Sequence, residues 1–220
     1  MLRNRIIYAL SYIFLLTGSY LSLLVLKPEK TLGEVYRIFF FHFPLAIVSY
    51  LAFAVSLVLS IAYLRSKKMR FDDLASSSIE IGLLFCVLAT ITGAIFSKQA
   101  WGAYWSWDPR QTTTLIVCFI YASYLALRSA IEDRETKARL SAIFGIFAFF
   151  SVPLSYLSTR LWFSLHPTMI TSKGMKLEKD MQIALLVMVI GMLFLYVGLL
   201  SLSSRIKKLE REGKTFYTKS

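Results

Sequence analysis

Six apolar stretches alternate with polar connectors along this chain. Each stretch is close to the roughly 20 residues that a helix needs to cross the hydrocarbon core of a bilayer. Their apolar character is continuous and lacks the period-two alternation of a barrel strand, which favours helices over a barrel. The pattern therefore predicts six transmembrane helices, over residues 6–26, 44–64, 79–97, 112–127, 140–157 and 182–202.

Composition agrees with an integral membrane protein. Apolar residues make up 56% of the 220 residues and charged residues 17%, whereas soluble domains have roughly 45–50% and about 25%. Without an internal repeat or a low-complexity segment, we expect residues 1–220 to form a single all-α domain. The first stretch is too long for a signal-peptide core and lacks a small-residue cleavage site, so we expect it to remain as a helix.

The formal net charge of +12 lies in the connectors and predicts the topology. Lys and Arg accumulate in cytoplasmic loops. With the N-terminus in the cytoplasm, sixteen of the 25 Lys and Arg fall on the cytoplasmic side and nine on the outer side. We therefore expect both termini in the cytoplasm and a multi-pass protein of the cytoplasmic membrane. The basic tail, residues 205–219, is expected to lie on anionic membrane lipid, and no nucleic-acid partner is expected.

This topology gathers three features on the outer face. His42 lies in the first outer connector, the sequence WGAYWSWDPRQT (residues 101–112) joins helices 3 and 4, and His166 lies in the third outer connector. His42 and His166 are the only two histidines of the chain. We therefore expect the functional site to be built from loops at membrane-interface depth, and not as a pocket inside the helix bundle.

The tryptophan-rich connector predicts a flat apolar surface for a ligand. Aromatic residues are common at bilayer interfaces, and anchoring of the loop is the alternative interpretation. However, Trp101, Tyr104, Trp105 and Trp107 fall within seven residues, which is more than anchoring requires. If the loop is helical, Trp101 and Trp105 lie one turn apart on the same face. Gly102 would then let a ligand approach the backbone closely.

The end of this connector has the pattern of a helix start. Asp108 is a preferred N-cap residue, Pro109 is favoured at the first helical position, and Gln111 occupies the capping-box position. The helix N-terminus and Arg110 together form a positive site that can receive an anionic group. Asp108 is therefore expected to cap the fourth helix and to fix the direction in which the aromatic loop leaves it.

Two histidines on one face suggest a ligand that contains iron. A single histidine near an apolar surface is more often a packing residue. Taken one at a time, His42 and His166 could each be such a residue. Two imidazoles without an acidic or Cys partner make a poor zinc site, but they suit haem b bound non-covalently, whose iron takes axial histidines. The haem propionates could pair with outer-face cations, namely Arg37, Lys98, Arg110 and Arg160.

The two cysteines are expected to be structural. Cys86 and Cys118 lie in the third and fourth predicted helices without CxxC spacing, so we expect two buried apolar thiols with no redox role. The chain also contains no C-x-x-C-H motif, so it cannot itself carry covalently attached c-type haem.

The connector WGAYWSWDPRQT resembles the W-G-x-x-W-x-W-D signature of the haem-handling proteins of cytochrome c biogenesis. The six helices, the length, His42 in the first outer connector and LWFSLHP in the third are similar to the CcmC family, which delivers haem in cytochrome c maturation. This resemblance spans essentially the whole chain. It implies that His42 and His166 are axial haem ligands and that the haem contacts Trp101, Trp105, Trp107 and Asp108.

The resemblance also implies partners. They are an extracytoplasmic haem chaperone that receives the haem, an ABC-type ATPase with its membrane subunit, and a small single-helix membrane subunit. The chain has no G-x-x-x-x-G-K-[ST] loop, so ATP hydrolysis must come from another chain. Pro109 and Gln111 are more similar to the synthase branch, so a haem-binding cytochrome c synthase-type protein (CcsA-like) is the alternative.

Three other classes of function fit the sequence less well. A secondary transporter usually places ionisable residues or interrupted helices at the membrane midplane, and the clearest break in this chain is Pro153, near the outer end of the fifth helix. A lipid or glycan transferase would need paired acids or a metal cluster, and Asp108 is the only acid in its loop. A purely structural scaffold leaves the histidines and the tryptophan loop unexplained.

Overall fold

The computed structural model describes residues 2–29, 32–166, 170–171, 174–175 and 177–217. Within this part of the chain, six helical segments are long and apolar enough to cross a membrane, which confirms the predicted all-α membrane fold. Most of them extend beyond the predicted stretches, because a helix keeps its own hydrogen bonds as it continues into polar flanking residues. The segments are Asn4–Val25, Glu34–Ser66, Met69–Trp101, Pro109–Ala130, Arg134–Leu161 and Lys179–Gly213.

The elements follow one another with short connections. The first half of the chain contains α1 (Leu2–Tyr20), which continues as a π-helix (Leu21–Val25), then a 3₁₀ helix (Glu34–Ile38), α2 (Phe39–Ser66) and α3 (Met69–Trp101). The second half contains α4 (Pro109–Ala130), α5 (Arg134–Ala148), α6 (Ser151–Leu161), and α7 (Lys179–Tyr217). Two short strands, β1 (Ile170–Thr171) and β2 (Gly174–Met175), pair antiparallel before α7.

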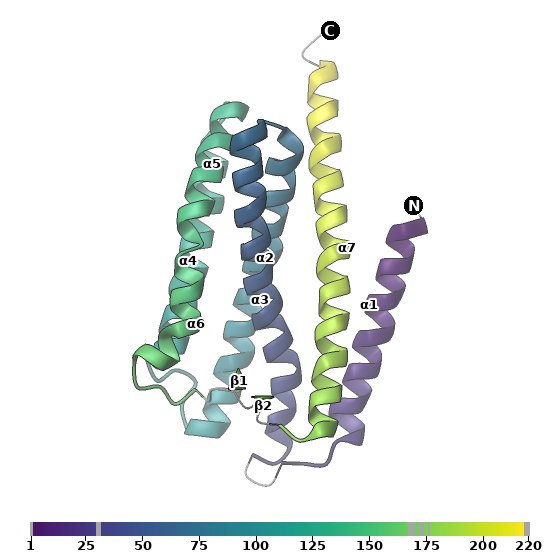
Figure 1. The fold of residues 1–220 in the computed structure, drawn as a ribbon, viewed down its shortest axis with the longest axis vertical. Helices are drawn as coiled ribbons and strands as arrows, with labels where there is room; N and C mark the ends of the chain where they lie inside the picture. Colours follow the sequence, from purple (N-terminus) through teal and green to yellow (C-terminus); the bar gives the residue numbers. More distant parts are fainter. Residues whose placement is uncertain (1, 30–31, 167–169, 172–173, 176, 218–220) are drawn as a thin grey trace.

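Figure 1 shows α2 and α3 side by side at the centre of the bundle, with α4, α5 and α6 on one side and α1 and α7 on the other. α1 packs mainly on α7, and α2 packs mainly on α3. Both chain termini point toward one end of the bundle, which we call the terminal end. The connector that precedes α2, the connector between α3 and α4, and the connector between α6 and α7 lie at the opposite end, which we call the distal end.

The fifth spanning segment is broken into α5 and α6, as Pro153 predicted. The break lies at Phe149 and Phe150 and not at the proline itself. Proline has no N–H, and its ring clashes with the carbonyl four residues earlier, which here belongs to Phe149. The Phe149 carbonyl instead accepts from the Val152 N–H at 3.0 Å. The axis of α6 therefore need not continue that of α5.

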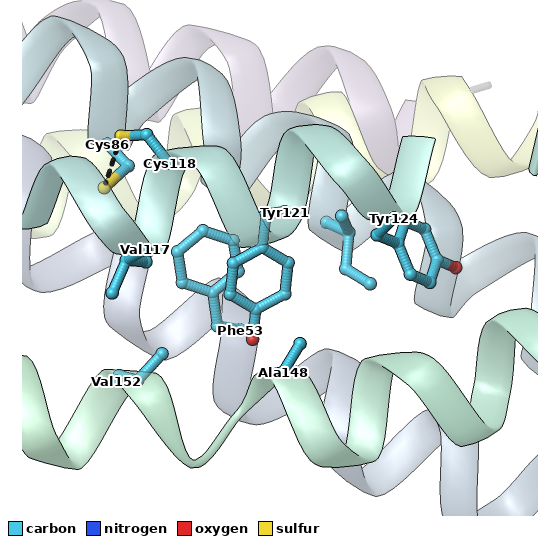
Figure 2. Packing of buried hydrophobic residues seen from close by; sticks show 9 residues of the cluster. Phe53, Cys86, Val117, Cys118, Tyr121, Tyr124, Ala148 and Val152 are labelled. Atoms are coloured by element: carbon cyan, nitrogen blue, oxygen red, sulfur yellow. Dashed lines mark hydrogen bonds between the residues drawn. The ribbon is translucent and has the colours of Figure 1, made fainter. Parts of the chain in front are cut away.

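The core beside α4 is aromatic and closely packed (Figure 2). Phe53 of α2 and Tyr121 of α4 stack with ring centroids 3.7 Å apart. Cys86 and Cys118 are buried, and the Cys118 thiol lies 3.4 Å from the Cys86 sulfur, which confirms the prediction of buried thiols. Because helices in a membrane associate through close packing, this cluster fixes α4 against α2 and α3 and so positions both ends of the tryptophan-rich connector.

Ion pairs join α3 to its neighbours near the terminal end. They are Asp72 with Arg128 of α4, Asp73 with Arg211 of α7, and Glu80 with Lys207 of α7, each at 2.7 Å. α7 continues as a helix through the basic tail to Tyr217, and Lys219 lies outside the described residues. Contact of this tail with lipid stays a prediction.

Candidate functional site

A cavity of about 340 Å³ opens at the distal end of the bundle. Helices α2, α3, α4 and α6 supply most of its wall, and the rest comes from the connectors, the 3₁₀ helix and α7. The sequence predicted a site built from loops, whereas most of the wall of this cavity comes from spanning helices. The wall is mainly apolar and aromatic, and it contains both histidines together with Trp105, Arg110 and Arg160.

His42 lies in the first turns of α2, not in the connector before it, which corrects the prediction. The 3₁₀ helix Glu34–Ile38 leads directly into α2, so the helix begins before Pro44. His42 Nδ1 lies 2.9 Å from the Ala89 carbonyl oxygen and 3.3 Å from Thr92 Oγ1, both on α3. Because a carbonyl only accepts, Nδ1 carries the proton and donates, which leaves the lone pair of Nε2 available for a metal.

Gly93 on α3 makes room for the His42 ring. A Cβ atom at Gly93 would lie 2.9 Å from His42 Cε1, closer than real Cβ contacts. The ring therefore packs directly on the α3 backbone at Gly93, and its hydrogen bond to the Ala89 carbonyl holds it there. Its orientation is set by the two packed helices before any ligand is present.

His166 lies on the connector after α6, and the structure brings it next to His42. The two ring centroids are 6.3 Å apart, and the Trp101 ring is 5.7 Å from that of His166. Burial lowers the pKa of His166 to about 4, and the positive charge of Arg110 contributes in the same direction. His166 is therefore neutral at pH 7. Among the described residues, none offers a hydrogen-bond partner to its buried Nδ1 atom.

The distance between the histidine rings fits one shared metal ion. Metal–imidazole bonds are about 2 Å long, so two rings that hold an ion from opposite sides have centroids roughly 6 Å apart. The observed 6.3 Å agrees with this geometry. Within the described residues, no cluster of three or more His, Cys, Asp or Glu could hold a metal ion.

Asp108 caps α4 as predicted and also binds a second segment. Its Oδ1 accepts from the Arg110 N–H at 2.8 Å, and its Oδ2 accepts from the Leu165 N–H at 2.7 Å. The Ser164 hydroxyl donates to both carboxylate oxygens. The predicted capping box is wrong, because the Gln111 amide oxygen accepts from the Ser106 N–H and not from Asp108.

The tryptophan-rich connector is not helical. α3 ends at Trp101, and Gly102 follows in the left-handed region with φ 83°. The prediction that Trp101 and Trp105 share one helical face is therefore wrong. Gly102 allows this chain reversal, and within 4 Å its missing Cβ would meet no atom. Trp105 lines the cavity, whereas Trp107 is 74% exposed and contacts Trp105 edge to face.

Two of the four candidate cations line the cavity. Arg110 donates to the carbonyl oxygens of Ser155 and Tyr156, and its guanidinium lies 5.6 Å from the Tyr50 ring centroid. Arg160 also lines the cavity. Within the described residues, Arg110 and Arg160 belong to no ion pair. The other two candidates are engaged elsewhere, since Arg37 pairs with Glu34 and Lys98 donates to the Gly102 carbonyl.

Sequence reasoning missed the residues that hold the histidines. Ala89, Thr92 and Gly93 come from another helix, and nothing in their spacing points to His42. Ser164 could have been found from a local pattern, because a serine hydroxyl often accepts from the N–H two residues later. Ser164 Oγ does accept from the His166 N–H, at 3.1 Å.

Comparisons with known proteins agree on one family. The family model described as "CcmC: Heme exporter protein C" matches residues 2–219. "Heme exporter protein C" of Bradyrhizobium diazoefficiens is 31% identical over 209 residues, which cover 94% of this chain and 79% of the relative. The protein of the same name in Haemophilus influenzae is 33% identical over 196 residues, 86% of this chain and 77% of the relative. A "Putative cytochrome c biosynthesis ccmC-like mitochondrial protein" of Marchantia polymorpha is 30% identical over 177 residues, 80% of this chain and 75% of the relative.

Proposed function

This chain belongs to the heme exporter protein C family, CcmC, and from that premise we propose that it binds haem at its distal end and delivers it for c-type cytochrome biogenesis. Haem is the cargo of the protein and not a resident cofactor. The observation that carries this proposal is the pair of imidazoles with ring centroids 6.3 Å apart in the wall of an apolar cavity.

His42 and His166 are the proposed axial ligands of the haem iron. His42 would bind through Nε2, since its Nδ1–H donates to the Ala89 carbonyl, and this second hydrogen bond is typical of metal-binding histidines. The buried Nδ1 of His166, which has no hydrogen-bond partner among the described residues, also supports a role in binding a ligand. Neutral imidazole is the form that binds iron, and the low pKa of His166 favours it.

The remaining cavity wall suits the rest of the haem molecule. Haem b has a flat apolar ring and two carboxylates, and it would be held without a covalent bond. Trp101 and Trp105 would cover part of the ring, while Arg110 and Arg160 would pair with the propionates. Trp107, which is exposed, and Gly102, which forms the turn, would shape the connector around the cargo.

The distal end is proposed to face the outer side of the cytoplasmic membrane. The excess of Lys and Arg in the connectors of the terminal end supports a cytoplasmic location for both termini. Haem held at the distal end would then be accessible to an extracytoplasmic haem chaperone. An ABC-type ATPase with its membrane subunit and a small single-helix subunit are the proposed further partners.

Delivery requires that the haem be held and then released. The cavity would bind haem by two iron–nitrogen bonds and by apolar contact, and no enzymatic step on the ring is needed. One proposed ligand lies on a packed helix, whereas the other lies on a connector. A partner could therefore displace the connector ligand first and leave the haem on His42 until transfer is complete.

The test is a visible absorption spectrum of the detergent-purified protein titrated with haem. Wild-type protein should give a Soret band that shifts on reduction, and His42→Ala and His166→Ala should each weaken haem binding, because an iron ligand is lost. Tyr12→Phe, an exposed position on α1, serves as the control. Equal binding by the wild type and the double-histidine variant would refute the ligand assignment.

A further inference from the structure

The Asp108 carboxylate joins the tryptophan-rich connector to the connector that carries His166. Asp108 is 5% exposed. Besides capping α4, it accepts from the Leu165 N–H at 2.7 Å and from the Ser164 hydroxyl at 2.8 Å. Hydrogen bonds to an ionised carboxylate are roughly twice as strong as those between neutral groups. Asp108 therefore uses both oxygens on protein donors, and the second set of donors belongs to the His166 segment.

Ser164 extends this connection to His166 itself. Its hydroxyl donates to Asp108 and accepts from the His166 N–H at 3.1 Å. The backbone of residues 164–166 is thus fixed at two points, the amide of Leu165 and the amide of His166. A fixed backbone at His166 restricts the positions that its imidazole can reach.

The side chains that precede Ser164 contribute little burial to this segment. α6 ends at Leu161, and the next side chains are exposed, Phe163 by 88% and Trp162 by 53%. Such a segment is not held by a buried core of its own. The hydrogen bonds to Asp108 therefore join its backbone to the start of α4.

We propose that Asp108 is a positioning residue that holds the His166 segment so that the His166 imidazole faces His42 across the cavity. Asp108 acts through Ser164 and Leu165 and does not itself need to touch the haem. The inference rests on the proposed function in that it takes His166 as an iron ligand. It explains why the signature loop and the third connector form one unit: the same carboxylate begins α4 and tethers the second ligand.

The substitution Asp108→Asn separates the two roles of this residue. Asn is as good an N-cap as Asp, so its amide oxygen can still accept from the Arg110 N–H. Its NH₂ group would then face the Leu165 N–H and could not accept from it. The variant should keep α4 capped and lose the hydrogen bond from the Leu165 N–H, while the Ser164 hydroxyl can still donate to the amide oxygen. Asp133→Asn is the matched control, because Asp133 caps α5 by accepting from the Thr136 N–H at 2.8 Å and is remote from the cavity.

The tether is measured first without haem. In hydrogen–deuterium exchange on the detergent-purified protein, Asp108→Asn should speed exchange of the Leu165 amide, which loses its acceptor, while Asp133→Asn should not. Ser164→Ala should speed the exchange of the His166 amide more than that of Leu165, because Leu165 still donates to Asp108. Unchanged exchange at Leu165 in Asp108→Asn would overturn the tether.

Haem binding is measured second, in a double-mutant cycle with His166→Ala. Asp108→Asn alone should raise the Kd for haem roughly 10- to 100-fold, as expected for loss of hydrogen bonds to a charged group. It should also shift the spectrum toward that of His166→Ala, and added imidazole should restore the six-coordinate form in both variants. In the His166→Ala background, Asp108→Asn should have no further effect on Kd.

The cycle distinguishes this proposal from a direct contact between Asp108 and haem. If Asp108→Asn weakens haem binding equally with and without His166, Asp108 does not act through His166 and the proposal is wrong. If His42→Ala and His166→Ala bind haem like the wild type, the proposed function fails instead. In that case the exchange experiment still decides whether Asp108 holds the segment.

Discussion

The two ends of the helix bundle use charged residues differently. At the terminal end, acids on α3 pair with bases on α4 and α7, and Asp72 and Arg128 form two parallel hydrogen bonds at 2.7 and 3.0 Å. At the distal end, Arg110 and Arg160 line a cavity and belong to no ion pair with the residues that the structure describes. The acids of α3 at the terminal end are paired within the chain, whereas Arg110 and Arg160 in the cavity wall form no ion pair with the described residues and can receive an anionic ligand.

This difference separates stability from binding. A buried charge that loses its partner is costly, so the terminal end depends on both members of each pair. The distal cavity keeps cations and imidazoles beside apolar surface, which costs stability and would suit the proposed ligand, a molecule with carboxylates and a metal. Substitutions at the terminal end should therefore change folding, and substitutions at the distal end should change haem binding.

The largest effect is expected at the terminal end. Asp72→Ala removes the partner of Arg128, whose side chain is only 16% exposed, and should lower the free energy of unfolding by about 3–5 kcal/mol. Denaturant unfolding in detergent micelles measures this change. The control is Glu212→Ala, in the exposed Lys208–Glu212 pair, which should change it by less than about 1 kcal/mol. Equal effects of the two substitutions would remove the contrast between the pairs.

The next effect is on charge at the distal end. Arg110→Gln should raise the Kd for haem roughly 10- to 100-fold, because charge-assisted bonds to a propionate are lost. Arg37→Gln is the control, since Arg37 pairs with Glu34 and lies outside the cavity wall. The haem titration should also be repeated with a haem diester, which has no propionate charge. If Arg110→Gln weakens binding of the diester as much as that of haem, the propionate assignment is wrong.

A smaller effect is expected where α3 supports His42. Gly93→Ala places a methyl group 2.9 Å from His42 Cε1 and should rotate the ring away, with roughly tenfold weaker haem binding, a typical cost of disturbing a metal ligand's support. Gly145→Ala is a matched helical control, because its new Cβ would meet no atom closer than 3.4 Å. Haem titration and the Soret position of both variants test this. Binding by Gly93→Ala that equals the wild type would mean that the ring is free to move.

The smallest effect distinguishes two tryptophans of one connector. Trp105→Ala should weaken haem binding a few-fold, since stacking of aromatic rings contributes about 0.5–1.5 kcal/mol. Trp107→Ala should change it less, because Trp107 is 74% exposed and lies outside the cavity wall. The same titration compares them. A larger loss with Trp107→Ala would indicate that the haem lies over the connector and not in the cavity.

The sequence predicted those features that depend on local patterns. The apolar stretches located all six spanning helices, and Asp108 and Pro109 located the start of α4, because helix length and N-capping are properties of neighbouring residues. The break near Pro153 was predicted for the same reason. The choice of histidines as candidate ligands needed only their residue type, their number and the topology.

The arrangement around the histidines could not be predicted because it depends on contacts between distant segments. His42 is held by Ala89 and Gly93 of another helix, and no local pattern pairs these positions. Gln111 fits a capping box by spacing, yet its side chain reaches Ser106 and Ser97, because the loop folds back over α4. The non-helical path of the tryptophan connector likewise follows from Gly102 and from tertiary contacts, and not from propensity alone.

The origin of the site in three distant parts of the chain has a consequence for biosynthesis. His42 lies on the second span, Asp108 precedes the fourth, and His166 follows the fifth. While the ribosome is still producing the early spans, the nascent chain offers a single imidazole and an aspartate with nothing to tether. If His42 and His166 are the two iron ligands, a chain that ends before the third outer connector would therefore carry only one of them.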